Sequence, residues 1–77
     1  MQITILIFGH LVELFGASEI ILKDLQDSDQ LIDSLNYQYP ELRNQKYAIA
    51  INKKVIISNT ILTEGSTVAL LPPFSGG

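Results

Sequence analysis

The chain has 77 residues, of which eight are acidic, five are basic and none is cysteine. This length allows one compact domain, which excludes a two-domain enzyme with its own cofactor fold. Without disulfides or a cysteine and histidine cluster for a structural metal, the domain must depend on a well-packed core, and 47% of its residues are hydrophobic.

The acidic balance argues against two classes of partner. The formal net charge is −3 and the basic residues are scattered, whereas nucleic-acid binders carry a basic face that neutralises phosphates. No apolar run approaches the ~20 residues of a membrane span, and the first residues lack the positive region of a signal peptide. We therefore expect a cytoplasmic protein that binds neither nucleic acid nor membrane.

The first third of the chain predicts two strands separated by a short helix. Residues 2–8 alternate isoleucines that share one face, and residues 19–23 predict a second strand. Between them, residues 10–16 carry apolar side chains at helical spacing and end in Gly16, which suits a helix C-cap.

The middle of the chain predicts one amphipathic helix. Asp27 or Ser28 can cap its N-terminus, and apolar residues recur at helical spacing as far as Tyr39. Pro40 ends the helix, and the polar residues 41–46 then predict a connection.

The last third predicts a hairpin and a final strand. Residues 47–51 alternate large and small side chains, residues 52–54 fit a tight turn, and residues 55–57 return. Gly65 permits a left-handed turn before the last strand, residues 67–71.

This order of elements predicts an α+β protein with the β-grasp fold. We expect a mixed sheet of about five strands, covered by one main helix plus a short helix. The crossover through the main helix allows the first and last strands to pair in parallel. We assign residues 1–72 to the β-grasp domain and residues 73–77 to a flexible C-terminal tail that ends in Gly-Gly.

Few side chains of this domain indicate chemistry. His10 is the only histidine and has no other catalytic residue type beside it. Four aspartates between residues 24 and 33 could suggest calcium, but the central glycine and closing glutamate of a calcium loop are missing. We interpret them as a solvated helix start, and Lys53-Lys54 as a hairpin tip that could contact a partner.

The ending Pro72-Pro73-Phe74-Ser75-Gly76-Gly77 is the most informative segment. Paired prolines cannot extend a central strand and favour an extended backbone, and Phe74 suits a pocket in a partner. Gly76 and Gly77 could thread a narrow channel and present the terminal carboxylate inside another protein. A frayed terminus is the alternative.

Strand parity predicts a docking face beside this tail. If the isoleucines of the first strand face the main helix, then Leu6, Phe8, Ala69 and Leu71 face outward, and Val55 or Ile57 can extend this apolar patch. The alternative is that another element covers it. The predicted partner-binding residues are Leu6, Phe8, Val55, Leu71, Pro72, Pro73, Phe74 and Ser75.

The sequence resembles the small subunit of molybdopterin synthase, the MoaD family of ubiquitin-like sulfur carriers. The resemblance covers the whole chain and is strongest in the turn at residues 62–65 and in the Pro-Pro-Phe-Ser-Gly-Gly ending. The chain departs from the family's pattern at Val12, where a basic residue is frequent, and at Ser66, where an aspartate is frequent. Residues 70–71 are leucines where aromatic residues are frequent.

The resemblance implies that Gly77 is the covalent site of sulfur transfer. In this family an E1-like adenylyltransferase (MoeB-like) uses ATP and magnesium to adenylate the terminal carboxylate, and a sulfur donor converts it to a thiocarboxylate. The tail then enters the large synthase subunit (MoaE-like), within a heterotetramer, and gives sulfur to a pterin precursor of the molybdenum cofactor. Gly76 permits the close approach. The chain alone would bind no cofactor or metal and would not be catalytic.

Three alternatives stay open. The chain could be a sulfur carrier for thiamine synthesis or tRNA thiolation, or a ubiquitin-like modifier that forms isopeptide bonds with lysines. It could also be a β-grasp interaction module with an inert tail.

Overall fold

The computed structural model describes residues 2–72. The elements follow in the order β1 (Gln2–Ile7), α1 (Leu11–Phe15), β2 (Glu19–Lys23), α2 (Ser28–Gln38), the 3-10 helix η1 (Pro40–Asn44), β3 (Ala48–Ile51), β4 (Lys54–Val55) and β5 (Thr67–Leu71). The predicted tail, residues 73–77, lies outside the described residues. Among residues 2–72 no helix has the length and apolar character needed to cross a membrane.

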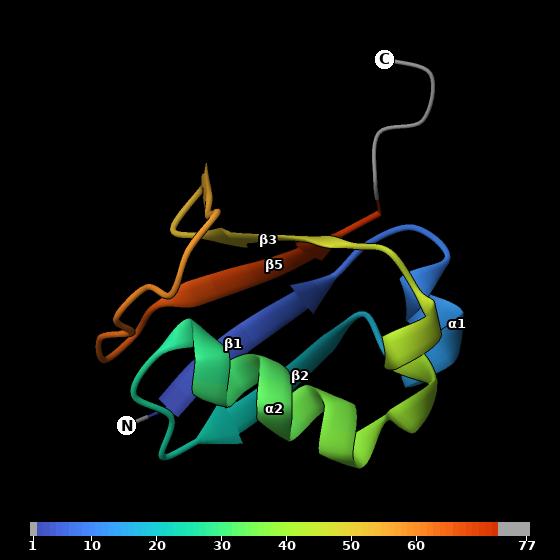
Figure 1. The fold of residues 1–77 in the computed structure, drawn as a ribbon, viewed down its shortest axis with the longest axis horizontal. Helices are drawn as coiled ribbons and strands as arrows, with labels where there is room; N and C mark the ends of the chain where they lie inside the picture. The colour runs from blue at the N-terminus through green and yellow to red at the C-terminus, as the bar shows by residue number, and fades with distance from the viewer. Residues whose placement is uncertain (1, 73–77) are drawn as a thin grey trace.

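The five strands form one mixed sheet in the order β2-β1-β5-β3-β4. β1 and β5 lie next to each other and are parallel, and the other neighbouring strands are antiparallel. Figure 1 shows α2 lying along one face of this sheet and α1 at one end of β1. A parallel pair needs a long crossover, and α2 lies within it. The topology is the predicted β-grasp fold.

The core lies between the sheet and α2. The side chains predicted to face the helix are buried, and Ile3, Ile5 and Val68 are wholly inaccessible to solvent. From the other side, Leu31 and Leu35 of α2 are equally buried. Burial of one such side chain stabilises the fold by roughly 1.5–3 kcal/mol, so this two-layer contact holds α2 against the sheet.

The predicted cap of α2 is present, and the residue after it has a different task. The side chain of Asp27 accepts a hydrogen bond from the backbone N–H of Gln30 at 2.9 Å. The Ser28 hydroxyl, which is buried, accepts from the N–H of Thr60 at 2.8 Å and donates to Oδ1 of Asn59 at 3.1 Å. Ser28 therefore fastens the loop between β4 and β5 to the start of α2.

This fastening explains why β4 is shorter than predicted. The prediction of a return strand over residues 55–57 is wrong, because β4 ends at Val55. The N–H of Ile56 still donates to the carbonyl of Ile49 at 2.9 Å, but the side chain of Ile57 is 99% exposed. The chain leaves the sheet here in order to reach the N-terminus of α2.

The turn between β3 and β4 is a two-residue loop of Asn52 and Lys53, with φ of +49° and +74°. Positive φ at both positions is the type I′ geometry, which matches the twist of a hairpin. Asn52 suits it, and its Oδ1 also accepts from the N–H of Thr67 at 3.0 Å. Lys53 carries the unfavourable left-handed conformation without a glycine's freedom.

The predicted connection at residues 41–46 does join α2 to β3, but it contains η1 over Pro40–Asn44, which the sequence did not predict. Pro40 stands at its start, where a missing N–H costs no helical hydrogen bond. Leu42 points into the core and is 0% exposed. A single apolar residue in a polar segment has no periodicity, so the pattern could not reveal it.

We expect Leu42→Ala to destabilise the domain by about 2–5 kcal/mol, since it removes buried side-chain volume and leaves a cavity. Arg43 is the neighbouring exposed residue of η1, and Arg43→Ala should stay within about 0.5 kcal/mol of the original protein. Urea denaturation of the two variants tests this difference. Equal stabilities would show that η1 does not close the core.

We expect Lys53→Gly to stabilise the domain by about 0.5–1 kcal/mol, because glycine removes the strain of a left-handed backbone. Lys54 is the matched control, since it lies in β4 and has a partner in Ile51. There a glycine should destabilise by a similar amount. Thermal unfolding of both variants gives the comparison, and a loss of stability in Lys53→Gly would contradict the assigned strain.

Candidate functional site: the open face of the sheet

The face of the sheet that α2 does not cover carries a row of aligned side chains. Glu19 pairs with Leu6, Leu6 with Ala69, Ala69 with Ala50, and Ala50 with Val55. Paired residues project to the same side of a sheet, so these five side chains cross all five strands in one line. One edge of the row is charged and the other four members are apolar.

A shallow hollow of about 390 Å³ lies on this row. The lining residues are Leu6, Phe8, Ala50, Asn52, Lys53, Thr67 and Ala69. The small side chains of Ala50 and Ala69 lie opposite one another and form its floor, while Phe8 lies at one end. Lys53 supplies a positive charge at the hairpin end. The hollow suits an apolar partner surface with a negative group near Lys53.

Exposure confirms the predicted outward orientation of this face at Phe8 and Val55, whereas the predicted extension by Ile57 is wrong, because Ile57 lies beyond β4 and lines a hollow on the helix side of the sheet. Phe8 is 44% exposed and Val55 is 59% exposed, while Leu6, Leu71 and Pro72 are partly buried. That these residues bind a partner stays a prediction. The remaining predicted site residues lie outside the described residues: Pro73, Phe74, Ser75, Gly76 and Gly77.

The base of the C-terminal segment adjoins the hollow. The N–H of Phe8 donates to the carbonyl of Leu70 at 3.2 Å, which continues the pairing of β1 with β5 by one residue. The next residue, Gly9, lies against the ring of Pro72. Phe8 therefore links the open face to the point where the chain leaves β5.

Within residues 2–72 the face presents mainly apolar side chains beside Asn52, Lys53 and Thr67, and no catalytic set. His10 is exposed and stands before α1 without a side-chain capping bond. No group of three or more His, Cys, Asp or Glu side chains among these residues is arranged to hold a metal ion. At the rim, the backbone N–H of Asn52 donates to the carbonyl of Thr67, and Oδ1 of Asn52 accepts from the N–H of Thr67. The arrangement can bind a surface, but it offers no acid–base pair.

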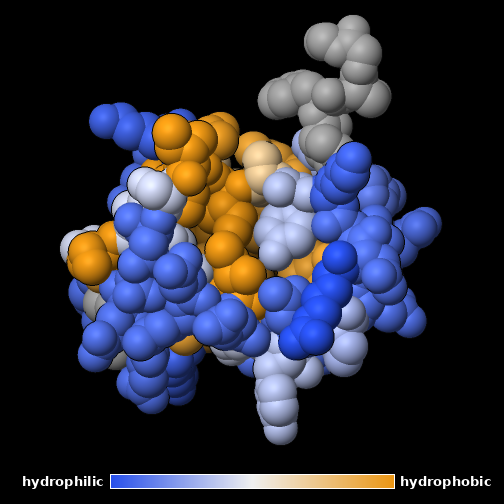
Figure 2. Space-filling model, in the orientation of Figure 1, coloured by the Kyte–Doolittle hydropathy of each residue, from blue (hydrophilic) through white to orange (hydrophobic). Residues whose placement is uncertain are grey.

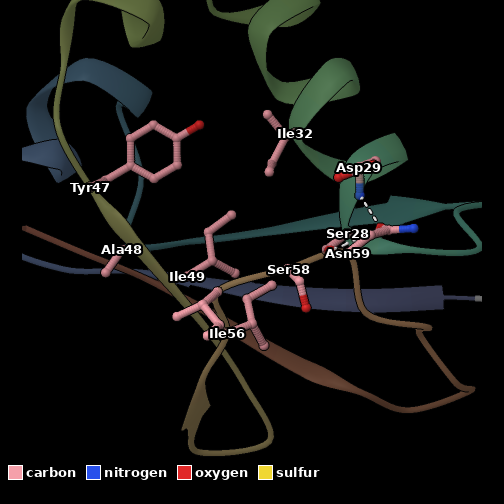
Figure 3. A pocket seen from close by; sticks show the side chains of 10 residues that line it. Ser28, Asp29, Ile32, Tyr47, Ala48, Ile49, Ile56, Ser58 and Asn59 are labelled. Carbon is pink, nitrogen blue, oxygen red and sulfur yellow. Dashed lines mark hydrogen bonds between the residues drawn. The ribbon is translucent and has the colours of Figure 1, made fainter.

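A second hollow of about 470 Å³, which the sequence did not predict, lies on the helix side of the sheet. Figure 2 shows apolar side chains gathered on this side, between α2 and the β3–β4 region. In Figure 3, Ile32 of α2 and Tyr47 lie across the hollow from Ile49 and Ile56. Burial raises the pKa of the Tyr47 hydroxyl, because it disfavours the charged phenolate.

Three polar residues of this second hollow, Ser28, Asp29 and Asn59, are hydrogen-bonded to one another. Oδ1 of Asn59 accepts from the backbone N–H of Asp29 at 2.9 Å, as drawn in Figure 3, and from the Ser28 hydroxyl. These bonds belong to the fastening of the loop to α2. We therefore assign this hollow a structural role and take the open face as the candidate site.

The turn before β5 shows how one departure from the family's pattern is accommodated. Gly65 has φ +80°, the left-handed conformation that its position predicts. Ser66, which is buried, accepts a hydrogen bond from the N–H of Thr63 through its hydroxyl at 3.0 Å. A serine can therefore close this turn and deliver the chain to β5.

The chain is similar in sequence to known proteins over nearly all of its length. The sequence matches the ThiS family over residues 5–77. The molybdopterin synthase sulfur carrier subunit of Mycobacterium tuberculosis is 29% identical over an alignment of 82 positions, which covers 100% of this chain and 99% of that protein.

Two solved structures extend the comparison. A complex of subunits 1 and 2 of the molybdopterin-converting factor from Helicobacter pylori contains a chain that is 29% identical, with full coverage of both chains and a TM-score of 0.77. The small archaeal modifier protein SAMP1 of Haloferax volcanii has a TM-score of 0.80, again with full coverage of both chains. At 21% identity it shows the fold alone.

Fold and neighbours together define a ubiquitin-like β-grasp domain with an open apolar sheet face. More specifically, the chain belongs to the ThiS family, whose match spans nearly all of it.

Proposed function

We propose that this protein is the sulfur-carrier subunit of a molybdopterin synthase. The observation that carries the proposal is the end-to-end similarity to the Mycobacterium tuberculosis protein of that name. The sequence supports it independently, because β5 ends at Leu71 and the chain continues through two prolines to Gly76-Gly77. The family match reaches the same last residue.

In the proposed mechanism the carboxylate of Gly77 is the reacting group. An E1-like adenylyltransferase with ATP and magnesium joins this carboxylate to AMP and releases pyrophosphate. Hydrosulfide released by a donor then attacks the acyl carbon, AMP leaves, and loss of the sulfur-bound proton gives a thiocarboxylate. Glycine suits this position because it has no Cβ to hinder the carbonyl carbon or to widen the channel. The sulfur then passes to a pterin precursor.

The acid–base groups of these steps are proposed to come from the partners. The chain has no cysteine that could carry sulfur on a side chain, and its open face offers a hollow lined by apolar groups. We propose that the large synthase subunit binds this face. The Helicobacter pylori complex of subunits 1 and 2 supports a partner of that kind.

The alternatives differ in the acceptor of the terminal acyl group. A carrier for thiamine synthesis or tRNA thiolation would form the same thiocarboxylate and bind another acceptor enzyme. A protein modifier would instead form lysine-linked adducts, which is the outcome that the likeness to a modifier protein makes worth testing. Since that likeness shows the fold alone, it does not displace the synthase.

The first test is the intact mass of the protein purified from its host. We expect a fraction whose mass differs by the exchange of one oxygen atom for one sulfur atom at the C-terminus. Removal of Gly77 should abolish this species and all sulfur transfer, while the melting temperature stays unchanged because the core lies within residues 2–72. Sulfur transfer by the truncated chain would refute the proposed role of Gly77.

The second test concerns the open face. We expect Phe8→Ala to weaken binding to the large synthase subunit by about tenfold or more, as loss of an aromatic anchor does. Tyr37 is a matched aromatic control, since it is 87% exposed on α2 and lies away from the hollow. Tyr37→Ala should change the Kd by less than about twofold. Calorimetric titration of the large subunit with each variant gives the two Kd values. Equal changes in Kd would contradict docking through Phe8.

A further inference from the structure

Gly9 contacts the ring of Pro72, and any other residue type at this position would displace that ring. Its backbone has φ +62°, and a Cβ built on it would lie 2.9 Å from Cγ of Pro72 and 3.4 Å from Cδ. Real Cβ atoms essentially never come so close to another heavy atom. The ring of Pro72 therefore rests directly on the backbone of residue 9.

The backbone of Gly9 is itself held from both sides. The preceding N–H, that of Phe8, donates to the carbonyl of Leu70 at 3.2 Å. The carbonyl of Gly9 accepts from the N–H of Val12 at 3.2 Å, which ties it to α1. The backbone of Gly9 is therefore restrained, and a side chain added there would displace Pro72 rather than move residue 9.

We propose that Gly9 is a positioning residue for sulfur transfer, because its bare backbone sets the direction in which the chain leaves the domain at Pro72. This inference rests on the proposed function. Pro72 fixes its own φ, and the proline that follows restricts it to an extended backbone. The backbone of Pro72 is therefore confined to an extended conformation.

The length of the segment makes this direction important. Five residues span at most about 17 Å when extended. If a partner's channel holds residues 73–77 extended, a change of about 10° at Pro72 displaces the reacting end by on the order of 3 Å. Misplacement of reacting atoms by about 1 Å can cost a rate factor on the order of 100.

The test compares Gly9→Ala with Gly16→Ala. Both glycines have a left-handed backbone, with φ of +62° and +73°, but a Cβ at Gly16 would meet nothing within 4 Å. The two alanines therefore carry similar backbone strain, and only the alanine at residue 9 collides with Pro72. Each variant is loaded with sulfur by its activating enzyme and mixed with the large synthase subunit in single-turnover experiments.

We expect Gly9→Ala to lower the single-turnover rate at saturating large subunit by on the order of 10- to 100-fold. Its Kd for the large subunit should change less than about twofold, and Gly16→Ala should keep both values. Equal rates for the two variants would overturn the inference. So would a weaker Kd with an unchanged saturated rate, since Gly9 would then act in docking.

A second background tests the contact itself. Pro72→Ala removes Cγ and Cδ, the two atoms nearest to the added Cβ. When both glycine variants also carry Pro72→Ala, the collision is absent. Gly9→Ala should then lower the single-turnover rate and the urea midpoint no more than Gly16→Ala does. A full effect of Gly9→Ala without the proline ring would contradict the inference. If Gly9→Ala does not fold, Gly9→Asn and Gly16→Asn replace the pair, because asparagine tolerates this backbone while still carrying a Cβ.

The urea midpoints make failure of the inference distinguishable from failure of the proposed function. They report the contact of Gly9 with Pro72 without any sulfur chemistry. If the protein without any substitution acquires no sulfur at its C-terminus, the proposed function fails. If it transfers sulfur normally and the two glycine variants match, only the positioning role of Gly9 fails.

Discussion

The parallel pairing of β1 with β5 is the contact on which the rest of the structure depends. It places the first strand beside the last one, with Ile5 opposite Val68 and Leu6 opposite Ala69. The first of these pairs faces α2 and is wholly buried, while the second faces outward. One pairing therefore builds both the core and the open face. Because it continues past β1 to Phe8, it also places the next residue, Gly9, against the ring of Pro72.

A domain of this size has little core to spare, since chains near 60 residues bury only about 60% of the surface they expose when unfolded. Each connection accordingly contributes to packing. Leu42 closes the core from η1, and the rings of Phe15 and Tyr39 join α1 to the end of α2 with centroids 4.4 Å apart. The open face keeps apolar side chains in contact with water. Its concave shape results from two opposed alanines, Ala50 and Ala69, and larger residues there would fill the hollow.

Regular periodicity made most of the fold and the orientation of the open face predictable from the sequence. The alternation in β1 and β5 decided which residues face α2, and the candidate caps Asp27 and Ser28 marked the start of the helix. What could not be predicted depends on contacts between distant residues. Leu42 is isolated in a polar segment, and β4 ends early because Ser28 holds a loop 32 residues later in the chain. The contact of Gly9 with Pro72 exists only once the parallel pairing has formed, and an isolated glycine gives no signal of it.

Under the proposed function, the geometry has a consequence for the order of events. The open face and the base of the C-terminal segment meet at Phe8, so a partner that takes up the segment also covers the hollow. The activating enzyme and the large synthase subunit both need the carboxylate of the same residue. If both also dock on the open face, they compete for one surface, and sulfur loading has to be followed by dissociation before transfer can begin.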